Sequence, residues 1–137
     1  ILGIDEHKYV SFGRNTLERM VVENPAMFNG KNYSAMYSGI IRGFHGYPKM
    51  SKSFPKSGIT VDMPETEISN LIENGEVATQ FPETNVIYQM ISAVSLYGSE
   101  QIREAYDECR KQSKCWKAIK LDYAIHLSQL CQRWMDE

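Results

Sequence analysis

The stretch that divides this chain lies before its midpoint and reads Lys49-Met50-Ser51-Lys52-Ser53-Phe54-Pro55-Lys56-Ser57-Gly58. It is polar, basic and rich in residues that end regular structure, so it predicts an exposed, mobile loop. The pattern before it mixes strand and helix, and the pattern after it is helical. We therefore expect a mostly α chain, with the end of an α/β domain over residues 1–62 and a helical bundle over residues 63–137.

Upstream of this loop, Ile1–Ile4 is typical of the end of a buried strand. Helical spacing of apolar residues then runs to Asn24-Pro25, and Asp5 can cap this helix because its carboxylate accepts bonds from the first N–H groups. Breaking residues interrupt positions 25–48, where we expect a short strand or turn around Met36 to Ile41. The apolar face of the helix consists of Tyr9, Val10, Phe12, Leu17, Met20 and Val21.

Downstream, Pro64 suits the start of a helix that Asn74-Gly75 ends. Another apolar face follows over residues 86–97, and Ser99 and Ser113 can cap two further helices. Faces of this kind, joined by short turns, predict an antiparallel helical bundle. The expected inward residues of its last two helices are Ile102, Ala105, Tyr106, Cys109, Trp116, Ile119, Tyr123, Leu127, Leu130 and Trp134.

Composition excludes several classes of protein. The chain has 137 residues, 42% of them hydrophobic and 23% charged, which is ordinary for a folded domain. No apolar run approaches the length of a membrane span, so we expect no membrane partner. The net charge of −2 does not attract DNA. The three cysteines lack metal-site or disulfide spacing, which favours a reduced, intracellular setting and no bound zinc.

The sequence starts without Met and without a signal peptide. A strand end that runs directly into a helix is the middle of an α/β unit. We therefore expect the C-terminal part of a longer protein, and a short protein with an unusual start is the alternative.

The motif Lys49-Met50-Ser51-Lys52-Ser53 matches the signature of class I aminoacyl-tRNA synthetases at every position. Gly43 and Gly46 before it resemble the approach to this signature in the tryptophanyl and tyrosyl subclass. After it, Pro55-Lys56-Ser57 and Asp62-Met63-Pro64-Glu65 resemble the tryptophanyl branch. Gly3-Ile4-Asp5-Glu6 is similar to that family's Gly-x-Asp-Gln motif.

The chain as a whole resembles the C-terminal part of a tryptophanyl-tRNA synthetase. The resemblance implies a Rossmann-like catalytic domain that ends in residues 1–62 and an anticodon-binding domain over residues 63–137. It implies ATP-dependent attachment of tryptophan to tRNA(Trp) through an adenylate, with Mg²⁺ arriving with ATP, in a cytoplasmic homodimer. A tyrosyl-tRNA synthetase and a non-catalytic RNA-binding or interaction module derived from a synthetase are the alternatives.

The resemblance also implies a role for each motif residue. Lys49 and Lys52 are the catalytic residues, because two ammonium groups on a closing loop stabilise the charge that pyrophosphate gains as it leaves. Met50 meets the adenine ring through its backbone, and Ser51 and Ser53 offer hydroxyl groups to phosphate oxygens. The glycines before the motif let the loop swing.

The remaining substrate contacts are implied near the start of the chain. Gly3 and Asp5 contact the ATP ribose, and Glu6 lies by the amino group of the amino acid. The family usually has Gln in place of Glu6, and a carboxylate there adds negative charge near the substrate carboxylate and the phosphates. The His-x-Gly-His motif of class I synthetases does not occur in these residues, and we expect this chain to be inactive by itself.

Some side chains have two open interpretations. The basic run of Arg110, Lys111, Lys114, Lys117 and Lys120 is either a solvated face or a tRNA contact. Tyr106 or Trp116 could stack on anticodon bases, although Trp116, Tyr123 and Trp134 favour core positions. We expect His45 in an exposed turn, and Lys56 is either a surface lysine or an addition to the loop's positive charge.

Overall fold

The computed structural model describes residues 2–3, 6–28, 30 and 34–136. It divides the chain into two compact units, residues 1–40 and residues 41–137, and each is described by itself. This division lies before the motif loop, whereas the sequence placed a domain boundary at 62/63. The loop therefore belongs to the same compact unit as the helices that follow it.

The first unit contains a short parallel pair of strands. Strand β1 (Leu2–Gly3) pairs with β2 (Tyr37–Ser38), in the register Leu2 to Tyr37 and Gly3 to Ser38. Helices α1 (His7–Glu23) and α2 (Pro25–Phe28) lie between them in sequence. The predicted strand near Met36 to Ile41 and the helix that ends before Pro25 are thus confirmed. A parallel pair joined through helices is a βαβ connection, of which this unit shows one.

The start of α1 differs from the prediction in its capping position. Glu6 occupies the N-cap of this helix and makes no side-chain capping bond. Asp5, which we expected to cap the helix, lies outside the described residues.

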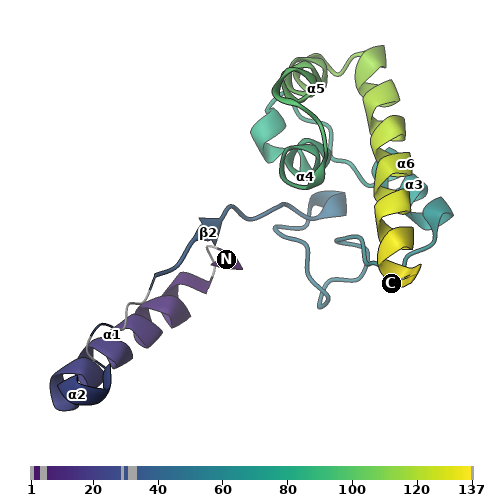
Figure 1. Cartoon of the computed structure of the whole chain (residues 1–137). Helices are drawn as coiled ribbons and strands as arrows, with labels where there is room; N and C mark the ends of the chain where they lie inside the picture. Colours follow the sequence, from purple (N-terminus) through teal and green to yellow (C-terminus); the bar gives the residue numbers. More distant parts are fainter. Residues whose placement is uncertain (1, 4–5, 29, 31–33, 137) are drawn as a thin grey trace. The chain divides into compact units, whose positions relative to one another are not determined.

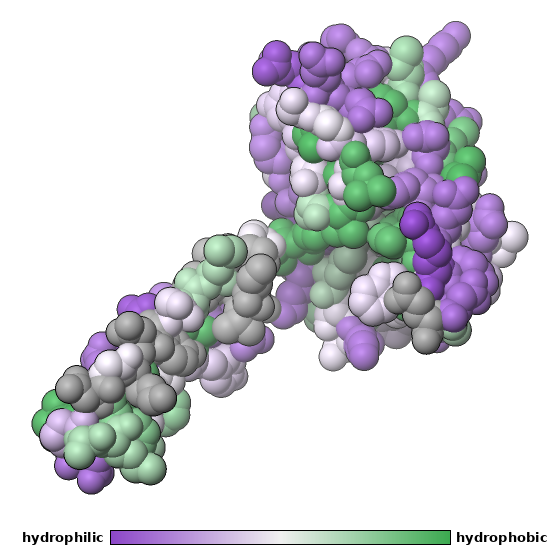
Figure 2. Space-filling model, in the orientation of Figure 1, coloured by the Kyte–Doolittle hydropathy of each residue, from purple (hydrophilic) through white to green (hydrophobic). Residues whose placement is uncertain are grey.

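Half of the predicted apolar face of α1 is exposed in this unit, and only Val10 of that face is buried. Val10 is buried, whereas Tyr9 and Phe12 are 75% and 74% exposed. Figure 2 shows apolar side chains gathered over α2 and the adjoining end of α1, where Met20, Val22 and Met27 are exposed. The residues with apolar spacing form a helix as predicted, but most of the apolar face of this helix is not buried, because the short strands and α2 offer little surface for it to pack against.

The second unit is helical, as expected. A short 3₁₀ turn, η2 (Phe44–Gly46), precedes the motif loop, and another, η3 (Pro82–Thr84), precedes α4. The helices are α3 (Glu65–Asn74), α4 (Val86–Val94), α5 (Ser99–Lys111) and α6 (Lys114–Asp136).

One hydrophobic core joins these helices. It contains Phe44 of η2, Ile68, Leu71 and Ile72 of α3, Val86, Ile87, Met90 and Ile91 of α4, Ala105 and Cys109 of α5, and Trp116, Tyr123, Ala124 and Leu127 of α6. Figure 1 shows α3 beside α6, and it shows α4 and α5 end-on where α6 is seen from its side. The bundle is confirmed, but α6 crosses α4 and α5 and is not antiparallel to them. Gln112, in the left-handed conformation with φ 51°, turns the chain between α5 and α6.

Helix ends follow local hydrogen bonds more closely than apolar spacing. Helix α4 ends at Val94, although the apolar spacing predicted a helix up to Tyr97. Just after this end, the Ser95 hydroxyl accepts a bond from the Tyr97 N–H at 3.3 Å. Gly98, rather than the predicted Ser99, is the N-cap of α5. Ser113 caps α6 as predicted, since its hydroxyl accepts from the Trp116 N–H at 3.1 Å.

A buried carboxylate connects α3, α4 and α6. Glu76 Oε1 accepts bonds from Asn85 Nδ2 at 2.5 Å and from Trp116 Nε1 at 3.0 Å, and Glu76 Oε2 pairs with Lys120 Nζ. The Glu76 and Lys120 side chains are 6% and 13% exposed. Asn85 also caps α4, because its Oδ1 accepts from the Ile87 and Tyr88 N–H groups. Glu76 thus holds three helices through one side chain.

Glu76→Gln should destabilise the whole chain by about 3 kcal/mol, because it leaves the nearly buried Lys120 ammonium without its counter-charge while keeping the shape of the side chain. Urea unfolding followed by circular dichroism measures this change.

The matched control is Glu73→Gln on the exposed surface of α3, which we expect to change stability by less than about 0.5 kcal/mol. Adding Lys120→Met to Glu76→Gln should recover part of the loss, because no buried charge is then left unpaired. Equal stability of Glu76→Gln and the native chain would refute the role of this ion pair.

Candidate functional site

The motif loop is tied to the helical core through its second residue. The Met50 N–H donates to the Ile41 carbonyl at 3.3 Å, and the half-buried Met50 side chain packs against the core. Gly58 lies so close that an added Cβ would be 3.1 Å from Met50 Cβ. Met50 therefore anchors the motif, and its neighbours extend from this anchor toward solvent.

The other motif residues lie at different depths. Lys49 and Ser51 are half-buried, whereas Lys52 and Ser53 are exposed. The Ser51 hydroxyl accepts a bond from the Ser53 N–H at 3.3 Å, and the Ser51 carbonyl accepts from the Phe54 N–H at 3.0 Å. Ser51 thus uses its polar atoms to fold the loop in this structure, while Lys52 and Ser53 stay accessible to a ligand.

An open pocket of about 790 Å³ lies in this loop. Its lining includes the predicted residues Met50, Ser51 and Lys52, and does not include Lys49 or Ser53. Lys56 adds a second cation to the wall, and Asp62 adds a carboxylate. Two ammonium groups beside an open cavity can bind a polyanion. The apolar wall of the pocket at Met50 can accept a flat ring.

Lys56 has an unusual backbone conformation for its residue type. Its φ is 65°, in the left-handed region that costs a residue with a side chain about 1 kcal/mol or more. The sequence left Lys56 open between a surface lysine and an addition to the loop's charge. Its place in the pocket wall favours the second interpretation.

Asp62 was part of the resemblance, but no role was predicted for it. Its pKa lies below the ordinary value of 3.8, chiefly because the Thr60 side chain donates a hydrogen bond to it, helped by its own backbone N–H and by the charge of Lys52. Loss of solvent around the carboxyl acts in the opposite direction and raises the pKa by more than the charge of Lys52 lowers it. The ionised carboxylate therefore interacts electrostatically with Lys52 of the motif. In the sequence, the one sign of this role was the spacing of Thr60 and Asp62, because a threonine two residues before an aspartate can donate a hydrogen bond to its carboxylate.

Thr60→Val should raise the pKa of Asp62 toward 3.8, and Lys52→Ala should raise it less. An NMR titration of the Asp62 carboxyl carbon measures both. Since the folded-state pKa is depressed, the carboxylate favours folding above pH 3.8, and this contribution is lost as pH falls through the folded-state value. A larger effect of Lys52→Ala than of Thr60→Val would contradict the order of causes.

The glycines before the motif allow close packing. A Cβ on Gly43 would lie 2.7 Å from Tyr47 Cβ, 2.8 Å from the Lys49 carbonyl oxygen and 3.0 Å from the Ser57 carbonyl oxygen. Gly46 has φ 78°, which favours glycine. These two positions therefore need glycine to build the base of the loop, and the predicted swinging of the loop stays a prediction.

His45 is exposed, as predicted, and lies in the turn at the base of the loop. Its backbone has φ 56°, and its N–H donates to the Gly75 carbonyl at 2.7 Å. This bond connects the loop base with the end of α3.

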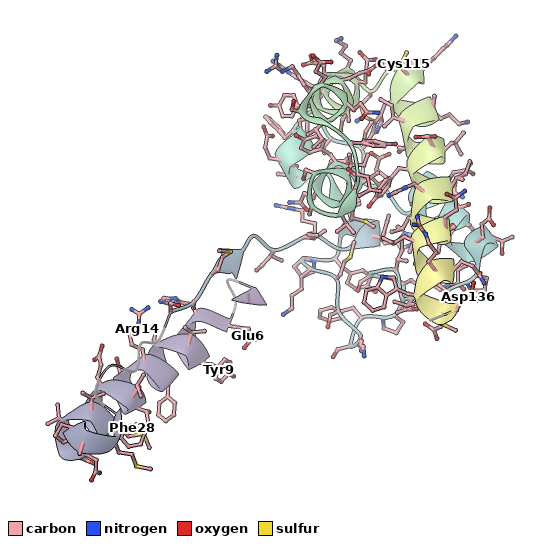
Figure 3. All side chains as sticks on the ribbon, in the orientation of Figure 1. Glu6, Tyr9, Arg14, Phe28, Cys115 and Asp136 are labelled. Carbon is pink, nitrogen blue, oxygen red and sulfur yellow. The ribbon has the colours of Figure 1, made fainter. Side chains whose placement is uncertain are left out.

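The predicted substrate contacts at the start of the chain belong to the other compact unit. Gly3 pairs with Ser38 in the parallel strands, and the exposed Glu6 begins α1. Figure 3 shows Glu6 and Tyr9 on one side of α1 and Arg14 on the opposite side. Asp5 lies outside the described residues.

The basic run divides between two pockets of the helical unit. Arg110 and Lys111 line an open pocket of about 780 Å³ with Phe81 and Tyr106, whereas Lys114, Lys117 and Lys120 line another of about 460 Å³. Lys120 is the buried partner of Glu76, so it belongs to the core of the unit and not to a solvated face.

Of the three aromatic residues expected in the core, Trp116 and Tyr123 are buried and Trp134 is not. Trp116 is 2% exposed and bonded to Glu76, so it cannot stack on a base, and Trp134 is 68% exposed although its spacing predicted a core position. Tyr123 is buried as predicted. Phe81, which the sequence analysis missed, is 68% exposed beside Tyr106, and its place before Pro82 was the signal of an exposed turn.

In the described part of the chain, histidine, cysteine and carboxylate side chains form no group of three or more that could hold a metal ion. No helix among residues 2–3, 6–28, 30 and 34–136 is long and apolar enough to cross a membrane.

A scan against protein-family models and a search of curated proteins found no match to this chain. The resemblance to synthetases therefore rests on the motif residues and on the chemistry of the pocket that they line.

Proposed function

We propose that this chain is part of an ATP-dependent aminoacyl-tRNA ligase and that residues 49–63 bind the pyrophosphate that leaves when ATP reacts with the amino acid. The observation that carries this proposal is the open pocket in which Lys52 and Lys56 lie beside Met50 and Ser51. Three of the five motif residues thus line an open cavity, together with a second lysine and the carboxylate of Asp62.

The chemistry explains why cations are needed there. A carboxylate oxygen of the amino acid attacks the α-phosphorus of ATP, and the bond from that phosphorus to the oxygen bridging to the β-phosphate breaks. Pyrophosphate leaves with the bonding electrons and gains negative charge. The ammonium groups of Lys52 at the pocket wall and, as the resemblance implies, of Lys49 stabilise this charge more in the transition state than in the ground state, and Lys56 adds to the field.

The finer assignments rest on the resemblance. They are a Rossmann-like catalytic domain containing Gly3, Asp5 and Glu6, tryptophan and tRNA(Trp) as substrates, Mg²⁺ arriving with ATP, and a cytoplasmic homodimer. The parallel strand pair and the exposed apolar side chains Tyr9 and Phe12 support a catalytic domain with further packing on α1. Because the His-x-Gly-His motif does not occur in these residues, this chain should bind pyrophosphate without forming an adenylate.

Lys52→Ala should weaken pyrophosphate binding to the chain about tenfold or more, because it removes a charged donor from the pocket wall. Isothermal titration calorimetry with pyrophosphate, with and without Mg²⁺, measures the affinity. Arg103→Ala, which removes an equal charge from the exposed surface of α5, is the control and should leave the affinity within about twofold. Equal affinities of Lys52→Ala and the native chain would remove the basis of the proposal.

The helical unit also has a surface suited to single-stranded RNA. The pocket beside α5 combines the exposed ring of Phe81 with Arg110 and Lys111, and Tyr106 donates a hydrogen bond to Glu83 at 2.7 Å. An exposed ring stacks on a base, and neighbouring cations contact phosphates. This surface suits the anticodon-binding role, and it suits equally the alternative of a non-catalytic RNA-binding module.

Phe81→Ala should weaken binding of a tRNA(Trp) anticodon stem-loop about tenfold, because one stacked base is worth about 1–3 kcal/mol. Fluorescence anisotropy at two salt concentrations measures the affinity. Leu96→Ala, at another exposed apolar position of the same unit, is the control. If both variants bind as the native chain does, this pocket is not the RNA contact.

Amino-acid-dependent ATP–pyrophosphate exchange separates the ligase from the binding module. If the chain is part of a ligase, we expect exchange when the chain is joined to a complete catalytic domain, and we expect Lys52→Ala to abolish this exchange. If the chain is a non-catalytic binding module, we expect it to bind RNA and to show no exchange with any amino acid.

A further inference from the structure

Ser57 is a buried polar residue that the proposed chemistry does not use. Its side chain is 0% exposed, although it lies in a polar, basic loop. Its hydroxyl accepts a bond from the Ser51 N–H at 2.9 Å and donates one to the Ser51 carbonyl at 3.1 Å. A single hydroxyl thus satisfies both backbone polar groups of the motif's central residue.

The backbone of Ser57 is held equally firmly. Its carbonyl accepts a bond from the Phe44 N–H at 2.9 Å, and its N–H donates to the Phe54 carbonyl at 3.0 Å. Phe44 belongs to the hydrophobic core and is 0% exposed. Ser57 therefore connects the backbone of Ser51 to the core of the helical unit.

These bonds enclose the segment that carries the exposed motif lysine. Lys52 follows Ser51 and Lys56 precedes Ser57, so the two pocket cations lie inside the turn that the Ser57 hydroxyl closes. Without that hydroxyl, the Ser51 N–H would lose the partner described here and the Ser51 carbonyl would keep only the Phe54 N–H, so the residues between would gain freedom.

We propose that Ser57 is a positioning residue that holds the backbone of Ser51 so that Lys52 stays at the wall of the anion pocket. This inference rests on the proposed pyrophosphate site and adds to it a residue outside the motif. Ser57 acts through Lys52 and does not touch the ligand, because its hydroxyl is already used twice within the loop.

A positioning role and a purely structural role differ in one measurable way. If Ser57 acts by placing Lys52, its removal should weaken pyrophosphate binding only while the Lys52 ammonium is present. If it only stabilises the fold, the loss should be the same with or without Lys52. A double-mutant cycle of Ser57→Ala and Lys52→Ala distinguishes the two.

The test uses the full chain and measures pyrophosphate affinity by calorimetry and amide exchange of Ser51 by NMR. We expect Ser57→Ala to speed exchange of the Ser51 N–H about tenfold and to weaken pyrophosphate binding about fivefold. In the Lys52→Ala background, Ser57→Ala should change the affinity by less than about twofold. Ser57→Cys, which keeps the buried volume and bonds weakly, should act in the same direction if Ser57→Ala does not fold.

The control is Ser128→Ala, which removes a half-buried hydroxyl that donates to the Ala124 carbonyl at 2.8 Å within α6. It should change neither measurement. Pyrophosphate binding that Ser57→Ala or Ser57→Cys leaves unchanged, or weakens equally in the Lys52→Ala background, overturns the positioning role and leaves the pyrophosphate site standing. No pyrophosphate binding by the native chain overturns the proposed site and the inference with it.

Discussion

The helical unit depends on one buried carboxylate. Glu76 follows α3 in sequence and binds the residue that caps α4, the indole of Trp116 and the ammonium of Lys120. These partners come from segments up to 44 residues away in sequence. A charge with so little exposure is tolerated because each of its oxygens has a donor, and the same bonds determine where α4 and α6 lie relative to α3. The core, and the loop that packs on it, take their positions from this arrangement.

The motif loop derives its shape from that core. Met50 packs on it, and Ser57 is bonded to the backbone of Phe44 within it. Gly43 allows the backbone segments at Lys49 and Ser57 to approach closely, and Lys56 takes a left-handed backbone conformation just before Ser57. Several anchors thus hold a short segment in which Lys52 and Ser53 stay exposed. A rigid base with exposed cations is what binding a small polyanion requires, since less ordering is then needed when the ligand arrives.

The proposed reaction needs groups from both compact units. Charge for the leaving pyrophosphate comes from the loop in residues 41–137, and the implied contacts to ribose and amino group, Gly3, Asp5 and Glu6, come from residues 1–40. In the place that the resemblance implies, the Glu6 carboxylate would pair well with an ammonium and would add negative charge near the reacting phosphates. The surface around Phe81 that we propose for RNA belongs to the helical unit alone, so RNA binding and pyrophosphate binding can be tested on this chain without the complete reaction.

The sequence by itself determined the helices and the motif. Apolar spacing and breaking residues predicted α1, α3, α5 and α6 nearly to their ends, because these signals act between residues a few positions apart. The motif predicts an anion site from its residue types alone, and that site stays a prediction. Only the tertiary structure decided that Ser57 and Asp62 take part in the loop, that Trp134 is exposed despite its core spacing, and that α6 crosses α4 and α5. Each of these depends on partners distant in sequence, or on packing that periodicity does not encode.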